Sequence, residues 1–339
     1  MAGRKRIVRN VLFVAAGLTL VTTAMVVAPL ALSRFHIELF STYLTYALVA
    51  VGLGMVFGYC GILSLGQFAF FGIGAYTVAM ITSRVVGIGP GHVLPVVLAG
   101  AMLAGLFGFL LSYVAFSLKL GTLFILVTIA VGSLFQKLAI AETNLFGGIN
   151  GIIMPYWIVP SDMRGLFRVF IGVLLVITTL LWLFVRSPFG RAIQGIRNKE
   201  GRVQSLGYNT VLLKSIAFAI STAIAGLGGA LYAVTTGFVS PGVFSFSLSF
   251  DAVIWVVIGG LGTLSGPILG TLLVNLAKFY LSSVLLQYWI IVVGVLFIAF
   301  VLFLPHGILG ALLPRRDAGH WLLRVRRGIL EVLGMRARD

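Results

Sequence analysis

Charged side chains are scarce in this chain: Lys, Arg, Asp and Glu make up 9% of its 339 residues, whereas hydrophobic residues make up 60%. The mean hydropathy of +1.13 leaves too little polar surface for a water-soluble domain. Apolar runs of roughly 20 residues recur along the chain, and each is long enough to cross a hydrocarbon core of about 30 Å as a helix. The composition therefore predicts an all-α protein, a polytopic transmembrane helical bundle.

Cysteine and histidine are also rare, and their positions exclude several kinds of site. The single cysteine, Cys60, excludes a disulfide framework within the chain and is typical of small core packing. The four histidines stand far apart, near the ends of apolar runs, without metal-ligand spacing. The sequence contains no P-loop and no catalytic triad. We therefore expect no metal, no cofactor and no enzymatic activity in this chain.

Acidic residues are few as well, 8 against 24 basic ones, which gives a formal net charge of +16. Most of the basic residues gather in three places: residues 4–9, 186–214 and 315–338. Such clusters beside membrane segments follow the positive-inside rule, which predicts that the N-terminus, the central basic loop and the C-terminal tail lie in the cytoplasm. Nucleic acid is not an expected partner, because these charges do not form a basic surface interleaved with aromatic side chains.

Ionisable side chains are nearly absent from the apolar runs themselves. Lys137 and Arg168 stand close to predicted ends, Asp251 just outside one, and Lys278 within the run 273–286. This leaves no proton relay or ion-coupling cluster of the kind that pumps and ion-driven carriers need. If the protein moves a substrate against a gradient, another polypeptide must supply the energy.

The apolar runs predict about ten membrane segments, six before the basic loop and four after it. An even number on each side of the loop returns the chain to the side where it started, which agrees with the charge rule. The segments are residues 11–32, 38–57, 62–82, 93–118, 120–140, 166–185, 215–234, 252–272, 273–286 and 288–304.

Two glycine-rich stretches interrupt these runs. Residues 58–76, GYCGILSLGQFAFFGIGAY, contain five glycines, and residues 257–270, VIGGLGTLSGPILG, contain Pro267 as well. Both carry Gly-x-Leu-Ser, at residues 61–64 and 262–265. Each glycine lowers helix propensity by about 1 kcal/mol relative to alanine, so a simple lipid-facing anchor has no reason to carry them.

Two explanations of the glycines stay open. They either let neighbouring helices approach closely, or they break helices so that free backbone and polar side chains face a water-filled path. Interrupted segments in corresponding positions of two halves are typical of transporter pathways, so we expect broken or re-entrant helices here. The candidate pathway residues are Gly61, Ser64, Gly66, Gln67, Gly262, Thr263 and Ser265.

The basic loop predicts a short amphipathic helix. Its sequence at residues 186–209 is RSPFGRAIQGIRNKEGRVQSLGYN, with Ser-Pro as a helix start and Gly207 as a stop. At about 100° per residue, one side is apolar and the other polar, so the helix would lie across the cytoplasmic ends of the bundle. A membrane-surface helix without a partner is the alternative. The apolar side holds Ala192, Ile193, Ile196, Val203 and Leu206; the polar side holds Arg191, Gln194, Arg197, Asn198, Arg202 and Ser205.

These three stretches resemble the inner-membrane permeases of branched-chain amino acid ABC importers, the LivH and LivM family, over roughly residues 39–305. NLFGGINGI, at residues 144–152, is similar to the external loop of its LivM-like members. The resemblance implies a multi-pass protein of the bacterial inner membrane, in complex with a second related permease, two cytoplasmic ATPases that bind ATP and Mg²⁺, and a substrate-binding protein.

The charge clusters and apolar runs divide the chain, and the resemblance assigns its basic loop. We expect a basic cytoplasmic N-terminus at residues 1–10, a transmembrane permease domain at 11–305 that contacts membrane lipid, and a basic cytoplasmic tail at 306–339. Within the permease domain, residues 186–212 form the coupling loop, which docks in a groove of the ATPase. The residues implied in this docking are Arg191, Arg197, Glu200, Arg202 and Gly207.

Several alternatives remain beside a branched-chain amino acid permease. Sugar permeases of the wider superfamily carry Asp where this chain has Ile62, which disfavours a sugar. Urea and short-amide permeases are closer relatives, and the FGG and NG of residues 146–151 are similar to theirs. An ATP-independent channel would share the broken helices, whereas a membrane-embedded assembly or anchoring protein would need no pathway. The permease interpretation implies transport by alternating access, in which this chain itself catalyses no reaction.

Overall fold

The structure is a computed structural model that describes residues 33–84, 89–159 and 162–285, together with residues 292, 294, 295, 307 and 308. The basic N-terminus and the predicted segment 11–32 lie outside these residues. So do most of the segment 288–304 and the tail beyond residue 308. The predicted cytoplasmic termini therefore stay a prediction.

The regular secondary structure of the described residues is helical apart from one pair of two-residue strands. β1 (Ile152–Ile153) and β2 (Phe238–Val239) pair antiparallel, with Ile152 opposite Val239. α2 continues in a π-helical turn, Val56–Cys60. The helices are α2 (Arg34–Met55), α3 (Gln67–Arg84), α4 (Val93–Ser117), α5 (Phe124–Ala141), α6 (Thr143–Phe146), α7 (Met163–Arg186), α8 (Pro188–Ser205), α9 (Thr210–Thr236), α10 (Phe246–Gly259) and α11 (Gly266–Leu285).

Within the described residues, five helical segments are long and apolar enough to cross a membrane. Each contains at least 20 residues, which a helical rise of about 1.5 Å per residue extends to about 30 Å or more. The count of about ten crossings stays a prediction. The five segments are Arg34–Cys60, Val93–Ser117, Gly121–Ala141, Met163–Arg186 and Thr210–Thr236.

The predicted segment 252–272 is wrong, because the chain turns within it. α10 ends at Gly259 and α11 begins at Gly266, so the predicted run 273–286 belongs to α11. Gly260 and Gly262 have φ angles of 132° and 84°, which residues with a side chain rarely adopt. Asp251, expected just outside a segment, lies inside α10. Hydropathy cannot locate such a turn, because glycines in a turn and glycines in a helix have the same hydropathy.

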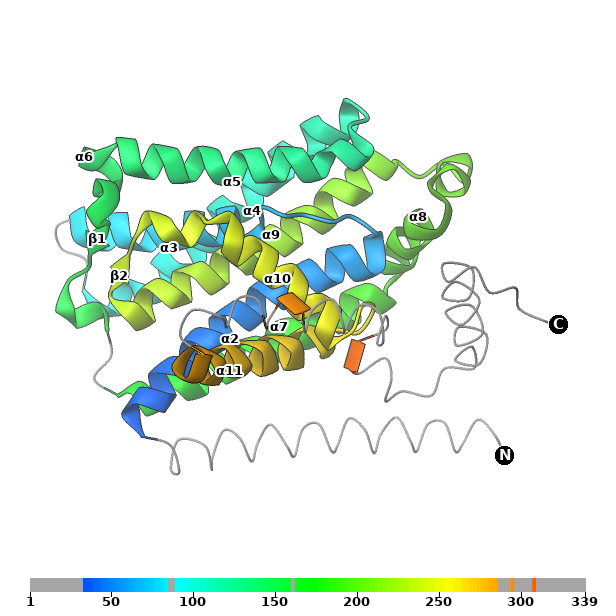
Figure 1. Cartoon of the computed structure of the whole chain (residues 1–339). Coiled ribbons are helices and arrows are strands. Elements are labelled where there is room, and N and C mark those ends of the chain that lie inside the picture. The colour runs from blue at the N-terminus through cyan, green and yellow to red at the C-terminus, as the bar shows by residue number, and fades with distance from the viewer. Residues whose placement is uncertain are drawn as a thin grey trace.

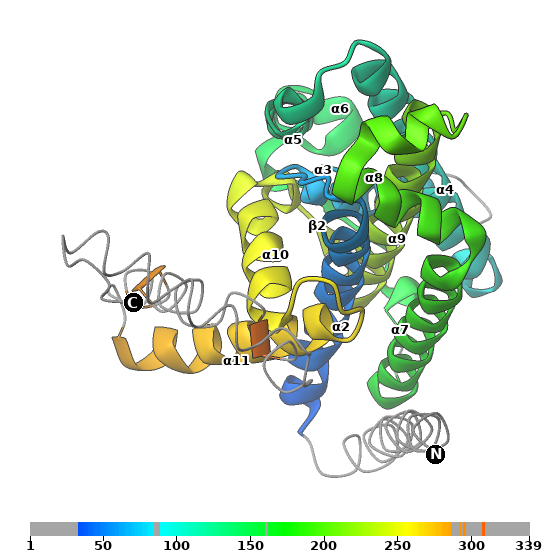
Figure 2. The same ribbon diagram turned by 90° about the vertical axis from the view of Figure 1, so that its right-hand side faces the viewer.

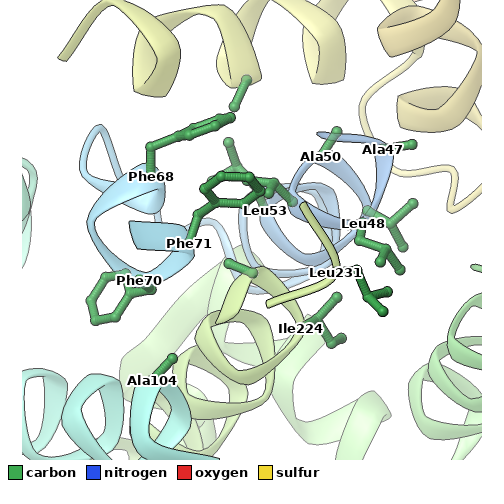
Figure 3. Packing of buried hydrophobic residues seen from close by; sticks show 14 of the residues in the cluster. Ala47, Leu48, Ala50, Leu53, Phe68, Phe70, Phe71, Ala104, Ile224 and Leu231 are labelled. Carbon is green, nitrogen blue, oxygen red and sulfur yellow. The ribbon is translucent and has the colours of Figure 1, made fainter. Parts of the chain in front are cut away.

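α9 lies at the centre of the bundle, where α2, α3 and α4 pack against it (Figure 1). Small residues make this packing close: a Cβ atom on Gly229 would lie 1.8 Å from the carbonyl oxygen of Phe71. Figure 3 shows the aromatic side chains of Phe68 and Phe71 on α3 turned toward α2, where Leu53 contributes to the same buried cluster.

The two ends of the bundle differ. α8 lies at one end, which faces the viewer in Figure 2, whereas α6, β1 and β2 lie at the other (Figure 1). Between the ends, α4, α5 and α7 turn large apolar side chains outward, as a surface in contact with lipid or another apolar subunit requires. Examples are Leu94, Met102, Leu106, Leu126, Val176 and Leu180.

Candidate functional site

The two glycine-rich stretches contain breaks that lie against each other. We call residues 58–66, from the last three residues of the π-helical turn up to the start of α3, the first break, and residues 260–265, between α10 and α11, the second break. The Tyr59 hydroxyl donates a hydrogen bond to the carbonyl oxygen of Gly262 over 2.9 Å. A Cβ atom on Gly58 would lie 2.9 Å from the Gly262 nitrogen, so the two backbones touch without room for a side chain. The fold thus brings together the two glycine-rich stretches.

The first break leaves helix-terminal amides that hydroxyl groups satisfy. Gly61, at φ 78°, ends the π-helical turn in the left-handed conformation. The Ser64 hydroxyl accepts from the Gly66 amide over 3.4 Å, and the Thr128 hydroxyl of α5 accepts from the Leu65 amide over 3.3 Å. The Ser249 hydroxyl of α10 accepts from the Phe68 amide over 3.2 Å. The start of α3 is therefore capped partly by other helices.

The sequence analysis did not identify Thr128 and Ser249 as part of the site. Both hydroxyls are fully or almost fully buried in apolar helices, at 0% and 2% exposure. A buried hydroxyl group needs a hydrogen-bond partner, so polar residues inside otherwise apolar runs are the signal that marks such positions. The sequence could not identify their partners, because more than 60 residues separate them from the first break.

Three of the predicted pathway residues pack inside the chain. The side chains of Ser64 and Gln67 are both 0% exposed. Gln67 Nε2 donates to the hydroxyl of Ser221 over 2.8 Å, and Gln67 Oε1 has no hydrogen-bond partner among the described residues. A Cβ atom on Gly66 would lie 1.9 Å from the Thr128 carbonyl oxygen. In this conformation these residues do not face an open passage, and their contacts favour the close-packing explanation of the glycines.

The second break is held by one threonine. The Thr263 hydroxyl donates to the carbonyl of Gly260 over 2.9 Å and accepts from the amide of Gly266 over 3.2 Å. It therefore joins the end of α10 to the start of α11, as an N-cap side chain does at a helix start. Gly61 and Ser265 are exposed, and Gly262 and Thr263 are partly exposed. Their part in a pathway stays a prediction.

The predicted amphipathic helix is present as α8. The Ser187 hydroxyl caps it by accepting from the Gly190 amide over 3.2 Å, and Pro188 stands in its first turn. Ile193, Ile196 and Val203 are buried, as the predicted apolar side requires. Two details differ from the prediction. α8 is kinked at Lys199, which has non-helical backbone angles, and Leu206, predicted on the apolar side, is 72% exposed.

The predicted coupling residues divide into two groups. Arg191 and Arg202 are exposed and line a hollow of about 590 Å³. Arg197 and Glu200 instead have their charged groups bonded to the bundle: Arg197 Nη1 donates to the carbonyl of Gly58, and Glu200 pairs with Lys214 of α9 at 2.5 Å. The hollow is lined by Pro188, Arg191, Ala192, Gly195, Asn198, Lys199, Arg202, Val203, Leu206 and Tyr208.

Gly207, the fifth predicted coupling residue, lies just beyond the end of α8. Its φ angle of 84° is left-handed, and its amide donates to the carbonyl of Gln204 over 2.9 Å. Asn209 then caps α9 by accepting from the Leu212 amide over 3.1 Å. Gly207 therefore serves as the turn between the two helices.

The ionisable residues of α10 and α11 pair with each other. Lys278 Nζ lies 2.6 Å from Asp251 Oδ2, and both side chains are mostly buried. Attraction between opposite charges at this distance offsets part of the free energy needed to take each charge out of water, which is high in a membrane. Among the described residues, no three His, Cys, Asp or Glu side chains gather as metal ligands would.

Sequence comparison assigns the family. The profile of a family described as a branched-chain amino acid transport system permease component matches residues 36–301, which include both breaks and α8. The chain belongs to this family. The match confirms the resemblance of the glycine-rich stretches and the basic loop. The family consists of membrane permease components, so the chain is a transport subunit and not an enzyme.

Named relatives agree with the family. The chain is 31% identical to the high-affinity branched-chain amino acid transport system permease protein LivM of Escherichia coli K12, over 85% of this chain and 73% of the relative. It is 28% identical to BraD of Pseudomonas aeruginosa, over 78% of this chain and 92% of the relative. LivH of Escherichia coli K12 is also 28% identical, over 78% of this chain and 91% of the relative. No solved structure matches the chain.

Proposed function

We propose that this chain is a permease subunit of an ATP-driven importer in a bacterial inner membrane, and that its substrates are branched-chain amino acids. The family match over residues 36–301 carries the proposal. The names of the relatives LivM, BraD and LivH all specify branched-chain amino acid transport, which supports this substrate class over urea or a short amide.

The importer needs further subunits. The sequence has no P-loop and its apolar runs have no ion-coupling cluster, so energy for uphill transport must come from ATPase subunits that bind ATP and Mg²⁺. A second related permease would complete the pathway, and a substrate-binding protein would deliver the amino acid. The similarity of the chain to both LivM and LivH supports a complex of two related permeases.

The ATPase would dock at α8. The hollow on this helix combines Arg191, Lys199 and Arg202 with the ring of Tyr208, so it fits an acidic segment of a cytoplasmic partner. ATP-driven closure of the ATPase pair would displace α8, and rocking of the two permeases would open the pathway on one side and then on the other. A path lined by backbone and hydroxyl groups binds its substrate weakly, which favours release.

The test begins with the complex as the cell makes it. The tagged chain would be purified in mild detergent from its native membranes, its co-purifying subunits identified by mass spectrometry, and the complex placed in liposomes. With the binding protein outside and ATP inside, we expect uptake of radiolabelled leucine. Liposomes that contain ADP in place of ATP are the control.

Each alternative predicts a different result. Uptake of urea in place of leucine would assign the amide class. Uptake that proceeds equally with ADP would show a facilitator. Purification without any ATPase would contradict the importer itself.

A further inference from the structure

α8 is bonded to the backbone of the first break. Arg197 Nη1 donates to the carbonyl of Gly58, which lies in the π-helical turn that ends α2. A helix leaves the carbonyls of its last turn without amide partners, and a guanidinium group there also interacts favourably with the helix dipole. The aliphatic part of the Arg197 side chain packs beside Gly61: its Cγ would lie 3.2 Å from a Cβ atom there.

The next residue of the chain extends the connection to the second break. Tyr59 follows Gly58, and its hydroxyl donates to the carbonyl of Gly262 over 2.9 Å. The close approach of Gly58 to the Gly262 nitrogen reinforces this contact. Arg197, Gly58, Tyr59 and Gly262 therefore form a continuous series from α8 through the first break to the second, which we call the break link.

α8 has a second and separate attachment. Beyond its kink at Lys199, Glu200 pairs with Lys214 of α9 at 2.5 Å. The polar bonds of α8 thus divide at the kink: the one before it goes to the first break, and the one after it to the central helix. A hydrogen bond is lost once its donor and acceptor are about 3.6 Å apart, so a displacement of the part of α8 before the kink must carry the Gly58 carbonyl with it or break the bond.

We propose that Arg197 and Tyr59 are positioning residues that hold both breaks in register with α8, so that a displacement of α8 moves the two breaks together. This inference rests on the proposed ATP-driven function and changes the role of Arg197: its guanidinium acts on the permease backbone and not on the ATPase. Tyr59, which nothing in the sequence singled out, carries the displacement to the second half of the chain.

The functional test measures leucine transported per ATP hydrolysed by the complete importer in liposomes. Arg197→Gln and Tyr59→Phe should each lower this ratio by about tenfold or more, because each removes a partly buried hydrogen bond, while assembly and ATP hydrolysis persist. Arg197→Lys keeps a cationic donor and should restore part of the ratio. Because the two residues act in series, the ratio in the double variant should fall no further than in the single variant with the larger loss.

Matched controls are Arg168→Gln and Tyr113→Phe, which remove the same groups from exposed positions on α7 and α4. Both should leave the ratio unchanged. A normal ratio in Tyr59→Phe, or fully additive losses in the double variant, would overturn the break link. Wild-type complex without ATP-dependent leucine uptake would overturn the proposed function instead, so the two failures are distinct.

Hydrogen exchange of the purified complex tests the link without transport. Arg197→Gln should speed amide exchange in residues 58–62 and also in residues 260–265, which Arg197 does not touch, by about tenfold or more. In the Tyr59→Phe background, the same substitution should speed exchange in residues 58–62 alone. Unchanged exchange in residues 260–265 of the Arg197→Gln variant would overturn the proposal.

Discussion

At the scale of single residues, the glycines of the two breaks meet two different requirements: some lie in close contact with neighbouring backbone, and others have left-handed backbone angles. Gly58 and Gly66 have no room for a side chain because the backbones of Gly262 and Thr128 lie against them. Gly61 and Gly262 instead require left-handed backbone angles. Because the two requirements apply at different positions, substitutions at those positions test them separately.

Gly66→Leu tests close packing. The sequence-based pathway hypothesis predicts loss of transport with the complex intact, whereas the 1.9 Å approach to Thr128 predicts lost stability and a lower yield of folded protein. Overpacking of this kind costs ~1–3 kcal/mol or more, which thermal unfolding in detergent would detect. Gly91→Leu is the control, because no atom lies within 4 Å of a Cβ there. A Gly66→Leu complex of normal yield and stability that fails in transport would favour the pathway hypothesis.

Thr263→Val tests the cap of the second break. Valine has a similar shape but neither donates to Gly260 nor accepts from Gly266, so we expect a loss of ~1 kcal/mol in the free energy of unfolding. Thr263→Ser retains the hydroxyl and should stay close to wild type. Equal stability of the two variants, measured by thermal unfolding, would show that the hydroxyl contributes nothing.

At the scale of secondary-structure elements, α8 has one side that contacts its own chain and one that is open. Ile193, Arg197 and Glu200 attach it to the bundle, while Arg191 and Arg202 line the exposed hollow. The open side of α8 is the one that the proposed docking of the ATPase would use, while the other side stays attached to the bundle.

Reversing Arg191 and Arg202 to Glu together should weaken binding of the ATPase by about tenfold or more, since the hollow then repels an acidic partner. Insertion should persist because Arg186, Lys199 and Lys214 remain in the basic loop. The measurement is the amount of ATPase recovered with the tagged permease. Reversal of Arg164 and Arg168, at the opposite end of α7, is the charge-matched control. Recovery of the same amount of ATPase with both double variants would contradict α8 as the docking site.

At the scale of the whole molecule, the basic loop lies at one end of the bundle. α8, with its arginines, lies at one end, and α6 with the strand pair lies at the other (Figure 1). The positive-inside rule predicts that α8 lies in the cytoplasm and that the loop around Ile149 lies outside it. The apolar outward faces of α4, α5 and α7 lie between these ends.

Cysteine labelling of intact cells tests this orientation. Cys60 is buried and would first be replaced by Ala. In that background, Ile149→Cys should react with a thiol reagent that cannot cross membranes, because Ile149 is 77% exposed at the outer end. Gly201→Cys, in the exposed part of α8, should react only after the membrane is permeabilised. The reverse pattern would invert the topology.

The sequence by itself determined the class of protein and the positions of its strongest signals. Apolar runs long enough for a bilayer predicted α4, α5, α7 and α9, and the alternation of Ile193, Ile196 and Val203 with arginines predicted α8. Hydropathy and helical periodicity are local properties, so they can be read without knowledge of the fold.

Only the tertiary structure decided which residues meet. The capping of α3 by Thr128 and Ser249, the contact of Tyr59 with Gly262, and the inward bond of Arg197 join residues 63 to 203 positions apart. The same arginine is compatible with a solvent-facing or a backbone-bonded position when only its helical face is known. The physical reason is that a hydrogen bond depends on the position of both partners, and the positions of distant partners are set by how the helices pack.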